Sequence, residues 1–178
     1  ATALNGAPLW GVDLTPAGDR PSDVSGGGIA AAAGRVYVAT GYGELIAVEA
    51  ASGRVIWRQQ LGAAVAGAPA VEGNTVYVVG RDSAAWAVDT TDGKVRWQIT
   101  GAAGQPGMVG SSAPAITDRL AILPMPSGEI RAVLKSAGVG VWQADIAGSR
   151  LGRAYALAAD VTGDPVVIGD TIYGGNAA

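Results

Sequence analysis

The segment that decides the fold is Ala87-Val88-Asp89-Thr90-Thr91-Asp92-Gly93-Lys94-Val95-Arg96-Trp97, because its pattern returns along the chain. The Gly-x-x-x-Trp element at its end occurs four times, with the tryptophans at Trp10, Trp57, Trp97 and Trp142. Successive tryptophans lie 47, 40 and 45 residues apart. A sequence period of about 40–50 residues is typical of β-propellers, whose blades are four-stranded sheets.

Each unit between two tryptophans has the composition of four short strands. In the second unit these are a Pro-Ala-Val segment at 69–71, a Val-Tyr-Val segment at 76–78, an Ala-Val-Asp segment at 87–89 and the segment that carries Trp97. β-Branched residues in alternation and Gly, Asn or Asp in the turns indicate strands, and no stretch keeps a helical period. We therefore predict an all-β chain, a partial β-propeller of four-stranded antiparallel blades in one domain.

The spacing predicts three complete blades within residues 1–178, at about 28–61, 68–100 and 113–147. A blade remnant is expected at 1–15 and a partial blade at 164–178. Residue 1 falls where a third strand should end, and residue 178 falls where a third strand should begin. We therefore expect the chain to be a portion of a larger ring.

The recurring glycine and tryptophan have a structural explanation. The glycine precedes the last strand of each blade, in a turn where a positive φ is expected. The tryptophan supplies a large flat surface that can pack between neighbouring blades, and a four-stranded sheet has two apolar faces that only neighbours can bury. We predict that the repeat tryptophans are structural docking residues between blades: Trp10, Trp57, Trp97 and Trp142.

Composition argues against several classes of function. The chain has a net charge of −3 and no basic run, which disfavours nucleic acid as a partner. It has no cysteine and no histidine, so thiolate chemistry, disulfides, the commonest general base and most zinc sites are excluded. We expect no cofactor and no catalytic residue, and a role in binding.

Long connections between blades are expected on one face of the propeller, because strands alternate in direction within a blade. These connections are 15–28, 101–112 and 148–163. The residues that follow position 148 include types favoured at protein interfaces. We predict a partner-binding surface that includes Arg150, Arg153, Tyr155, Asp160 and Asp164. An internal Arg–Asp pair that stiffens the connection is the alternative.

The pattern resembles the pyrroloquinoline-quinone-like propeller repeat, Ala-x-Asp-x-x-Thr-Gly-x-x-x-Trp. Residues 87–97 match it closely, residues 47–57 match with Glu49 and Ser52 as substitutions, and residues 132–142 keep Ala132, Gly138 and Trp142. Within this superfamily, residues 153–173 are most similar to the propeller lipoproteins of the bacterial outer-membrane β-barrel assembly machinery.

That resemblance implies a periplasmic, outer-membrane-associated scaffold. Its partners would be the periplasmic domains of the barrel-inserting subunit and unfolded outer-membrane proteins, with a lipid anchor outside this chain. Asp160 matches an acidic docking position of the family. Met108 and Val109 stand where the family has Leu and Arg before Gly-x-Ser-Ala-Pro, so they are further candidates for the partner surface.

Two alternatives stay open from the sequence. A quinone-dependent dehydrogenase would need a complete ring and a calcium site rich in carboxylate and amide oxygens. Many such enzymes also have adjacent cysteines, which this chain lacks. A polysaccharide- or peptide-binding propeller could use Trp86, which lies on a third strand, as a ligand platform. The simpler interpretation of Trp86 is a core aromatic.

Overall fold

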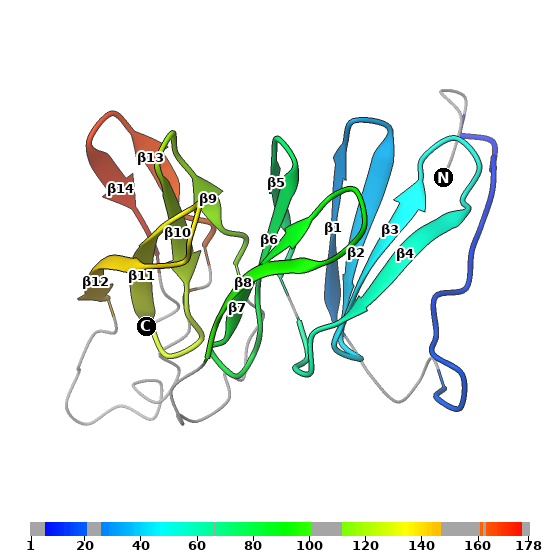
Figure 1. Cartoon of the computed structure of the whole chain (residues 1–178), viewed down its shortest axis with the longest axis horizontal. Coiled ribbons are helices and arrows are strands. Elements are labelled where there is room, and N and C mark those ends of the chain that lie inside the picture. The colour runs from blue at the N-terminus through cyan, green and yellow to red at the C-terminus, as the bar shows by residue number, and fades with distance from the viewer. Residues whose placement is uncertain are drawn as a thin grey trace.

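The computed structural model describes residues 6–20, 26–65, 67–100, 112–146, 161 and 163–175. Within these residues the chain forms three four-stranded antiparallel sheets and one two-stranded sheet, which confirms the predicted all-β partial propeller. The described part contains no helix long and apolar enough to cross a bilayer. Figure 1 shows the sheets side by side in chain order.

The sheets are blades in which each strand pairs with the next one along the chain. Blade 1 contains β1 (Gly27–Ala32), β2 (Arg35–Thr40), β3 (Glu44–Glu49) and β4 (Val55–Gln60). Blade 2 contains β5 (Ala70–Glu72), β6 (Thr75–Val79), β7 (Ala85–Asp89) and β8 (Val95–Ile99). Blade 3 contains β9 (Ala115–Ile116), β10 (Leu120–Pro124), β11 (Glu129–Leu134) and β12 (Gly140–Asp145). The two-stranded sheet contains β13 (Val166–Ile168) and β14 (Thr171–Tyr173).

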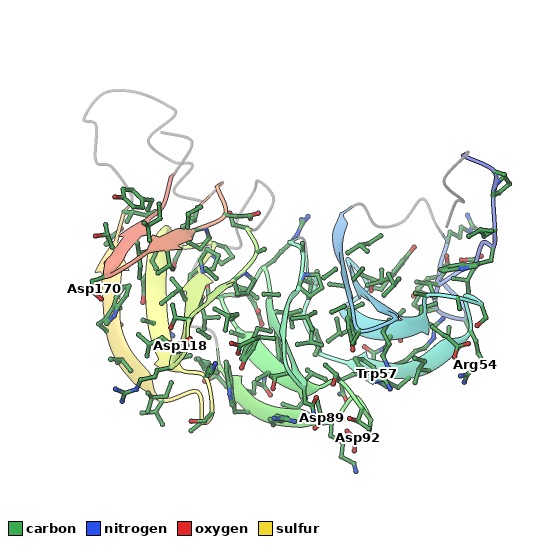
Figure 2. All side chains as sticks on the ribbon, turned by 90° about the horizontal axis from the view of Figure 1, so that it is seen from above. Arg54, Trp57, Asp89, Asp92, Asp118 and Asp170 are labelled. Carbon is green, nitrogen blue, oxygen red and sulfur yellow. The ribbon has the colours of Figure 1, made fainter. Side chains whose placement is uncertain are left out.

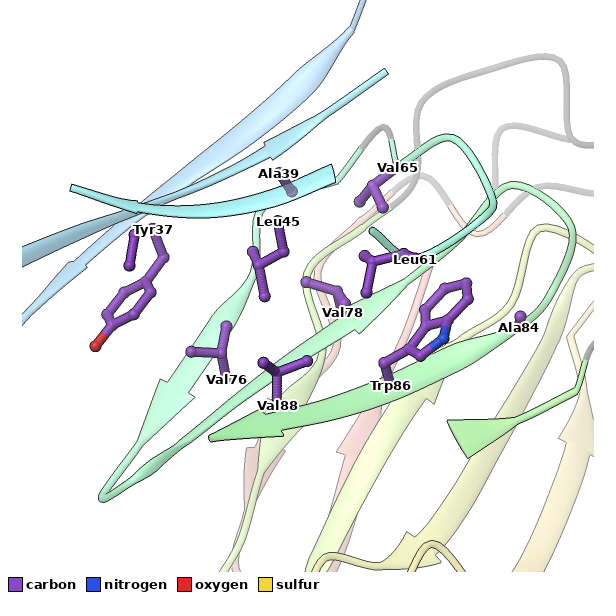
Figure 3. Close-up of a cluster of buried hydrophobic side chains, with 11 residues drawn as sticks. Tyr37, Ala39, Leu45, Leu61, Val65, Val76, Val78, Ala84, Trp86 and Val88 are labelled. Atoms are coloured by element: carbon purple, nitrogen blue, oxygen red, sulfur yellow. The ribbon is translucent and has the colours of Figure 1, made fainter. Parts of the chain in front are cut away.

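Blades stack face to face, and the apolar core lies between them. The cluster between blades 1 and 2 includes Tyr37, Leu45, Val76 and Trp86 (Figure 3). Similar clusters lie between blades 2 and 3 and between blade 3 and the β13–β14 sheet. Trp86 is buried in the first of these clusters, so it is a core aromatic and not a ligand platform.

Blades 1 and 2 each contain an aromatic pair that links the second strand to the fourth across the third. In blade 2 the register places Tyr77 opposite Ala87, and Ala87 opposite Trp97. The small alanine lets the two rings meet across it, with their centroids 5.9 Å apart. The same row in blade 1 brings Tyr37 and Trp57 within 6.0 Å across an alanine. The alanine of the repeat therefore serves the packing of the rings on either side.

One contact recurs between successive blades, and we call it the joint: an indole N–H donates to a carbonyl oxygen in a turn of the next blade, and the indole ring covers the glycine of that turn. The indole Nε1 of Trp57 donates a hydrogen bond to the carbonyl oxygen of Thr90, 3.0 Å away in blade 2. That carbonyl lies three residues before Gly93, whose φ is 77°. A Cβ on Gly93 would lie 2.8 Å from the Trp57 ring, so the ring requires a glycine beneath it. The sequence therefore needs glycine here both for its φ and for its missing side chain.

The same joint forms at two further places. Trp10 donates to the Ala50 carbonyl at 2.9 Å and covers Gly53, and Trp97 donates to the Lys135 carbonyl at 2.9 Å and covers Gly138. In these contacts the indoles of Trp10, Trp57 and Trp97 each pack on a glycine turn of the next blade, which is the arrangement that the prediction of docking residues requires. Trp142 is 38% exposed, and no joint of this kind covers it within the described residues.

Replacing Gly93 with alanine tests the joint. We expect Gly93→Ala to lower the free energy of unfolding by about 2–4 kcal/mol, because it adds left-handed strain to a clash with Trp57. Gly73→Ala is the matched control, since its φ is 53° but nothing lies within 4 Å of its added Cβ. That control should lose only about 1 kcal/mol. Urea unfolding measures the free energy of unfolding of both variants. Equal losses would show that contact with the Trp57 ring does not restrict position 93.

Candidate functional site

The propeller has two ends that differ in what they carry. We call the end with the β1–β2 and β3–β4 turns, and their equivalents, the turn face. The opposite end, with the β2–β3 turns and the connections between blades, is the connection face. Antiparallel pairing fixes this division, and Figure 1 shows the β1–β2, β5–β6 and β13–β14 turns at one end. Figure 2 looks onto that end, where Arg54, Asp92, Asp118 and Asp170 follow the arc of the blades.

Charged groups on the turn face mostly pair with each other. Asp89, the acidic residue of the repeat, accepts hydrogen bonds from the Arg96 guanidinium at 2.6 Å and from the backbone N–H of Thr91 at 2.7 Å. These hydrogen bonds, with that of Arg96 the larger cause, lower the pKa of Asp89 to about 2. Glu49 is the equivalent residue in blade 1, and bonds to Ser52 and Arg54 likewise lower its pKa. These acids hold their own turns together.

One ion pair on this face links two blades. The Lys135 ammonium of blade 3 lies 2.7 Å from a carboxylate oxygen of Glu72 in blade 2. It also donates to the carbonyl oxygen of Thr117 at 3.1 Å. The backbone carbonyl of the same lysine accepts the Trp97 indole, so both ends of Lys135 serve the joint between blades 2 and 3.

On the connection face, two segments far apart in the sequence are joined. Ser112 Oγ donates a buried hydrogen bond to the Val161 carbonyl at 2.8 Å. The backbone N–H of Ala113 donates to Asp164 Oδ1 at 2.7 Å. We call these two bonds the clasp. It joins the end of one predicted connection, 101–112, to the end of the other, 148–163, so the two predicted connections share a base.

A second polar cluster ties the N-terminal segment to blade 1. Glu44 is only 6% exposed, and its carboxylate accepts from Arg58 and from Gln60 at 3.0 Å each. Arg58 also donates to the Leu14 carbonyl at 3.2 Å. Pairing satisfies the buried carboxylate, whose isolation would be costly. The alternation of Arg58 and Gln60 on one face of β4, opposite Glu44, is a signal that sequence reasoning missed.

Of the predicted partner-binding residues, the structure describes Asp164. Its side chain is exposed at the connection face, and one of its carboxylate oxygens is used by the clasp. The other predicted residues lie outside the described residues and remain predictions: Met108, Val109, Arg150, Arg153, Tyr155 and Asp160. Ser112 is a residue of this site that sequence reasoning did not single out.

Comparison with known proteins identifies relatives over nearly the whole chain. A family model described as outer membrane protein assembly factor BamB matches residues 1–177. The BamB proteins of Moranella endobia and Yersinia pestis are 27% and 25% identical to this chain, and each match covers 96% of it. The match covers 45% and 44% of those proteins, so the chain spans less than half the length of these curated relatives.

Solved structures show the same fold. The crystal structure of BamB from Moraxella catarrhalis matches with a TM-score of 0.73 and 22% identity, over 85% of this chain and 46% of that one. A quinohemoprotein alcohol dehydrogenase from Comamonas testosteroni matches with a TM-score of 0.56 and 21% identity, over 66% of this chain and 20% of that one. At these identities the structural matches establish the fold alone.

The pKa of Asp89 gives a test by pH. A carboxyl group whose pKa is lowered on folding stabilises the folded state above its unfolded pKa, near 3.8, and loses that contribution as the pH falls to about 2. The difference in urea midpoint between the wild type and Asp89→Asn should therefore shrink between pH 5 and pH 2.5. Other acids titrate in both proteins and cancel. A difference that stays constant with pH would show that the Asp89 charge adds nothing.

Substitutions at Asp164 test the clasp. Asp164→Ala removes the acceptor for the Ala113 N–H and should lower the free energy of unfolding by about 0.5–1.5 kcal/mol. Asp164→Asn keeps an acceptor oxygen at the same place, so most of this loss should be restored. Urea unfolding at pH 7 measures both variants. If Asn and Ala were equally destabilising, the negative charge and not the hydrogen bond would matter.

Proposed function

The chain belongs to the family of the outer membrane protein assembly factor BamB, and on that basis we propose that it is a non-catalytic scaffold in outer-membrane protein assembly. It works on the periplasmic side of the outer membrane. Its connection face binds the periplasmic domains of the barrel-inserting subunit. The clasp is the observation that supports this proposal most directly, because it gives two predicted binding segments one base.

The chemistry of the connection face suits a protein partner. Arg150, Arg153 and Tyr155 belong to residue types that often dominate binding energy when they anchor in a partner's pocket. Met108 and Val109 add apolar contact, and Asp160 and Asp164 add acidic groups. Long connections on a rigid scaffold are a common location for binding residues. By contrast, Asp89, Asp92 and Glu49 on the turn face are already used within their own turns.

Unfolded outer-membrane proteins are the second class of partner that we propose. The outermost strand of blade 3, β12, is exposed at every one of its residues. An exposed strand edge offers backbone N–H and C=O groups to an extended chain, which can add to the sheet as a further strand. This mode of binding would not depend strongly on the partner's sequence, as a scaffold for many different barrel proteins requires.

A quinone-dependent dehydrogenase is the less supported alternative. Within the described part of the chain, no three acidic residues gather as a metal site, and the sequence has no cysteine to place beneath a quinone. The residues present do not fit that cofactor, so no step through it is derived. A polysaccharide-binding propeller loses its main support, because Trp86 is a core residue.

Binding to the periplasmic domains of the barrel-inserting subunit tests the proposed function. We expect the chain to bind these domains in surface plasmon resonance, and Asp160→Ala and Arg153→Ala each to weaken binding by about fivefold or more. Asp92→Ala is the matched control, since it removes an exposed carboxylate from the turn face. It should leave binding unchanged.

Circular dichroism should first show that every variant is folded. A folded chain that does not bind, or one whose binding is weakened equally by Asp92→Ala, would contradict a partner surface on the connection face.

A further inference from the structure

A polar cavity of about 210 Å³ lies on the turn face between blades 1 and 2. Residues at the β1–β2 turn of blade 1 form one side of it, and the β5–β6 and β7–β8 turns of blade 2 form the other. Both blades that enclose it have all four strands. Among the described residues that line this cavity, Arg35 is the only charged one.

The Arg35 side chain carries hydrogen-bond donors that the described residues do not use. Its guanidinium donates to the carbonyl oxygen of Thr90 in blade 2, and it forms no ion pair within the described part of the chain. Glu49 lies opposite Arg35 in the strand register, but Ser52 and Arg54 already bind that carboxylate. A guanidinium has five N–H donors in a planar fork. Most of these donors, and the positive charge, are therefore available to an acceptor in the cavity.

A buried hydroxyl group belongs to the same cavity. Tyr37 lines it, and only 1% of this residue is exposed. Figure 3 shows its hydroxyl oxygen at the edge of the apolar cluster between the two blades. No other described residue forms a hydrogen bond with that hydroxyl, whereas the equivalent hydroxyl of Tyr77 lies 3.5 Å from the Lys135 carbonyl oxygen. Because a buried hydroxyl without a partner is destabilising, this group needs an acceptor in the cavity.

The next interface, between blades 2 and 3, shows which group is missing here. There Glu72 of blade 2 pairs with Lys135 of blade 3 at 2.7 Å. Glu72 pairs in register with the first residue of β6, and Ala32 pairs in register with the first residue of β2, Arg35. Ala32 is therefore the equivalent of Glu72. Blade 1 has an alanine and a cavity at the place where blade 2 has a carboxylate.

The composition of the cavity favours a carboxylate on a short aliphatic stem. A guanidinium fork matches the planar carboxylate, and a single cation balances its single charge, whereas a phosphate group would keep charge uncompensated. Ala32 and Val71 supply apolar surface along which a stem can pack. A glutamate side chain has this composition, and Glu72 shows that the equivalent position holds one.

We propose that this cavity binds a glutamate side chain of a polypeptide partner. The carboxylate accepts hydrogen bonds from the Arg35 guanidinium and the Tyr37 hydroxyl, and the stem packs on Ala32 and Val71. The turn residues at the mouth, among them Asn74 and Thr91, are exposed, so the partner's backbone stays at the surface. One ion pair holds a free acid only weakly, and a polypeptide adds backbone contacts at the mouth. The site lies on the turn face and goes beyond the function proposed for the connection face.

The substitution Ala32→Glu tests the cavity from within the chain. It places a glutamate where blade 2 has Glu72, so it should pair with Arg35 and raise the melting temperature by about 2–4 °C. In the Arg35→Gln background the same substitution should lose most of this gain, because the cation is gone. Thermal unfolding at pH 7 measures the four proteins of this cycle. A glutamate that fails to stabilise the wild type, or that stabilises both backgrounds equally, would overturn the proposal.

Titration with short ligands identifies the occupant. The ligands are a capped peptide with one glutamate between glycines, the same peptide with glutamine, and propionate as a free acid. We expect the glutamate peptide to shift the Arg35 Nε–H resonance in NMR spectra with a Kd of about 1–10 mM. The glutamine peptide and propionate should each bind at least threefold more weakly. Ala32→Glu should abolish the shift, because its own side chain fills the cavity.

The titration separates the source of the carboxylate from the existence of the site. Equal binding of the glutamate and glutamine peptides, or no shift with any ligand, would overturn a carboxylate site. Propionate that binds as tightly as the glutamate peptide would overturn a polypeptide as the source. None of these measurements involves the connection face, so a failure here leaves the test with Asp160→Ala and Arg153→Ala unaffected.

Discussion

The indole that reaches over a glycine to a carbonyl of the next blade is the interaction on which this molecule depends. It combines an apolar contact with a hydrogen bond, and both require the same backbone geometry in the neighbouring turn. A blade is a thin sheet with two apolar faces, so its stability comes from its neighbours. The joint and a buried apolar cluster lie together between blades 1 and 2 and again between blades 2 and 3.

The two faces of the propeller divide structural and functional roles. On the turn face the connections are short, and the acidic residue of each turn is used locally, as Asp89 is by Arg96 and Thr91. Such groups have little left to offer a partner. On the connection face the chain varies in length between blades, and the clasp joins residues that the repeat does not constrain. A repeat can therefore keep its joints unchanged while its connection face acquires a binding surface.

The repeat made most of the fold predictable from sequence. Gly93 and Trp97 are local signals with a fixed spacing, so their place in the blade follows from the pattern. Trp86 was ambiguous, because strand alternation does not tell which of two apolar faces meets a neighbour. The clasp was beyond prediction for a different reason: Ser112 and Val161 are 49 residues apart and lie in segments without periodicity. Contacts of that kind depend on the path of each connection, which no repeat encodes.

Because each blade contacts only its neighbours, the stability of such an array is close to a sum of blade and joint contributions. A joint lost in the middle therefore weakens two blades, whereas the blade at an end has one joint fewer to lose. The interfaces between blades 1 and 2 and between blades 2 and 3 illustrate this arrangement, because each contains both a buried apolar cluster and an indole hydrogen bond. Apolar packing holds the two neighbouring sheets together, and the hydrogen bond fixes which turn the indole covers. A substitution that breaks either contact therefore weakens both of the blades that it joins.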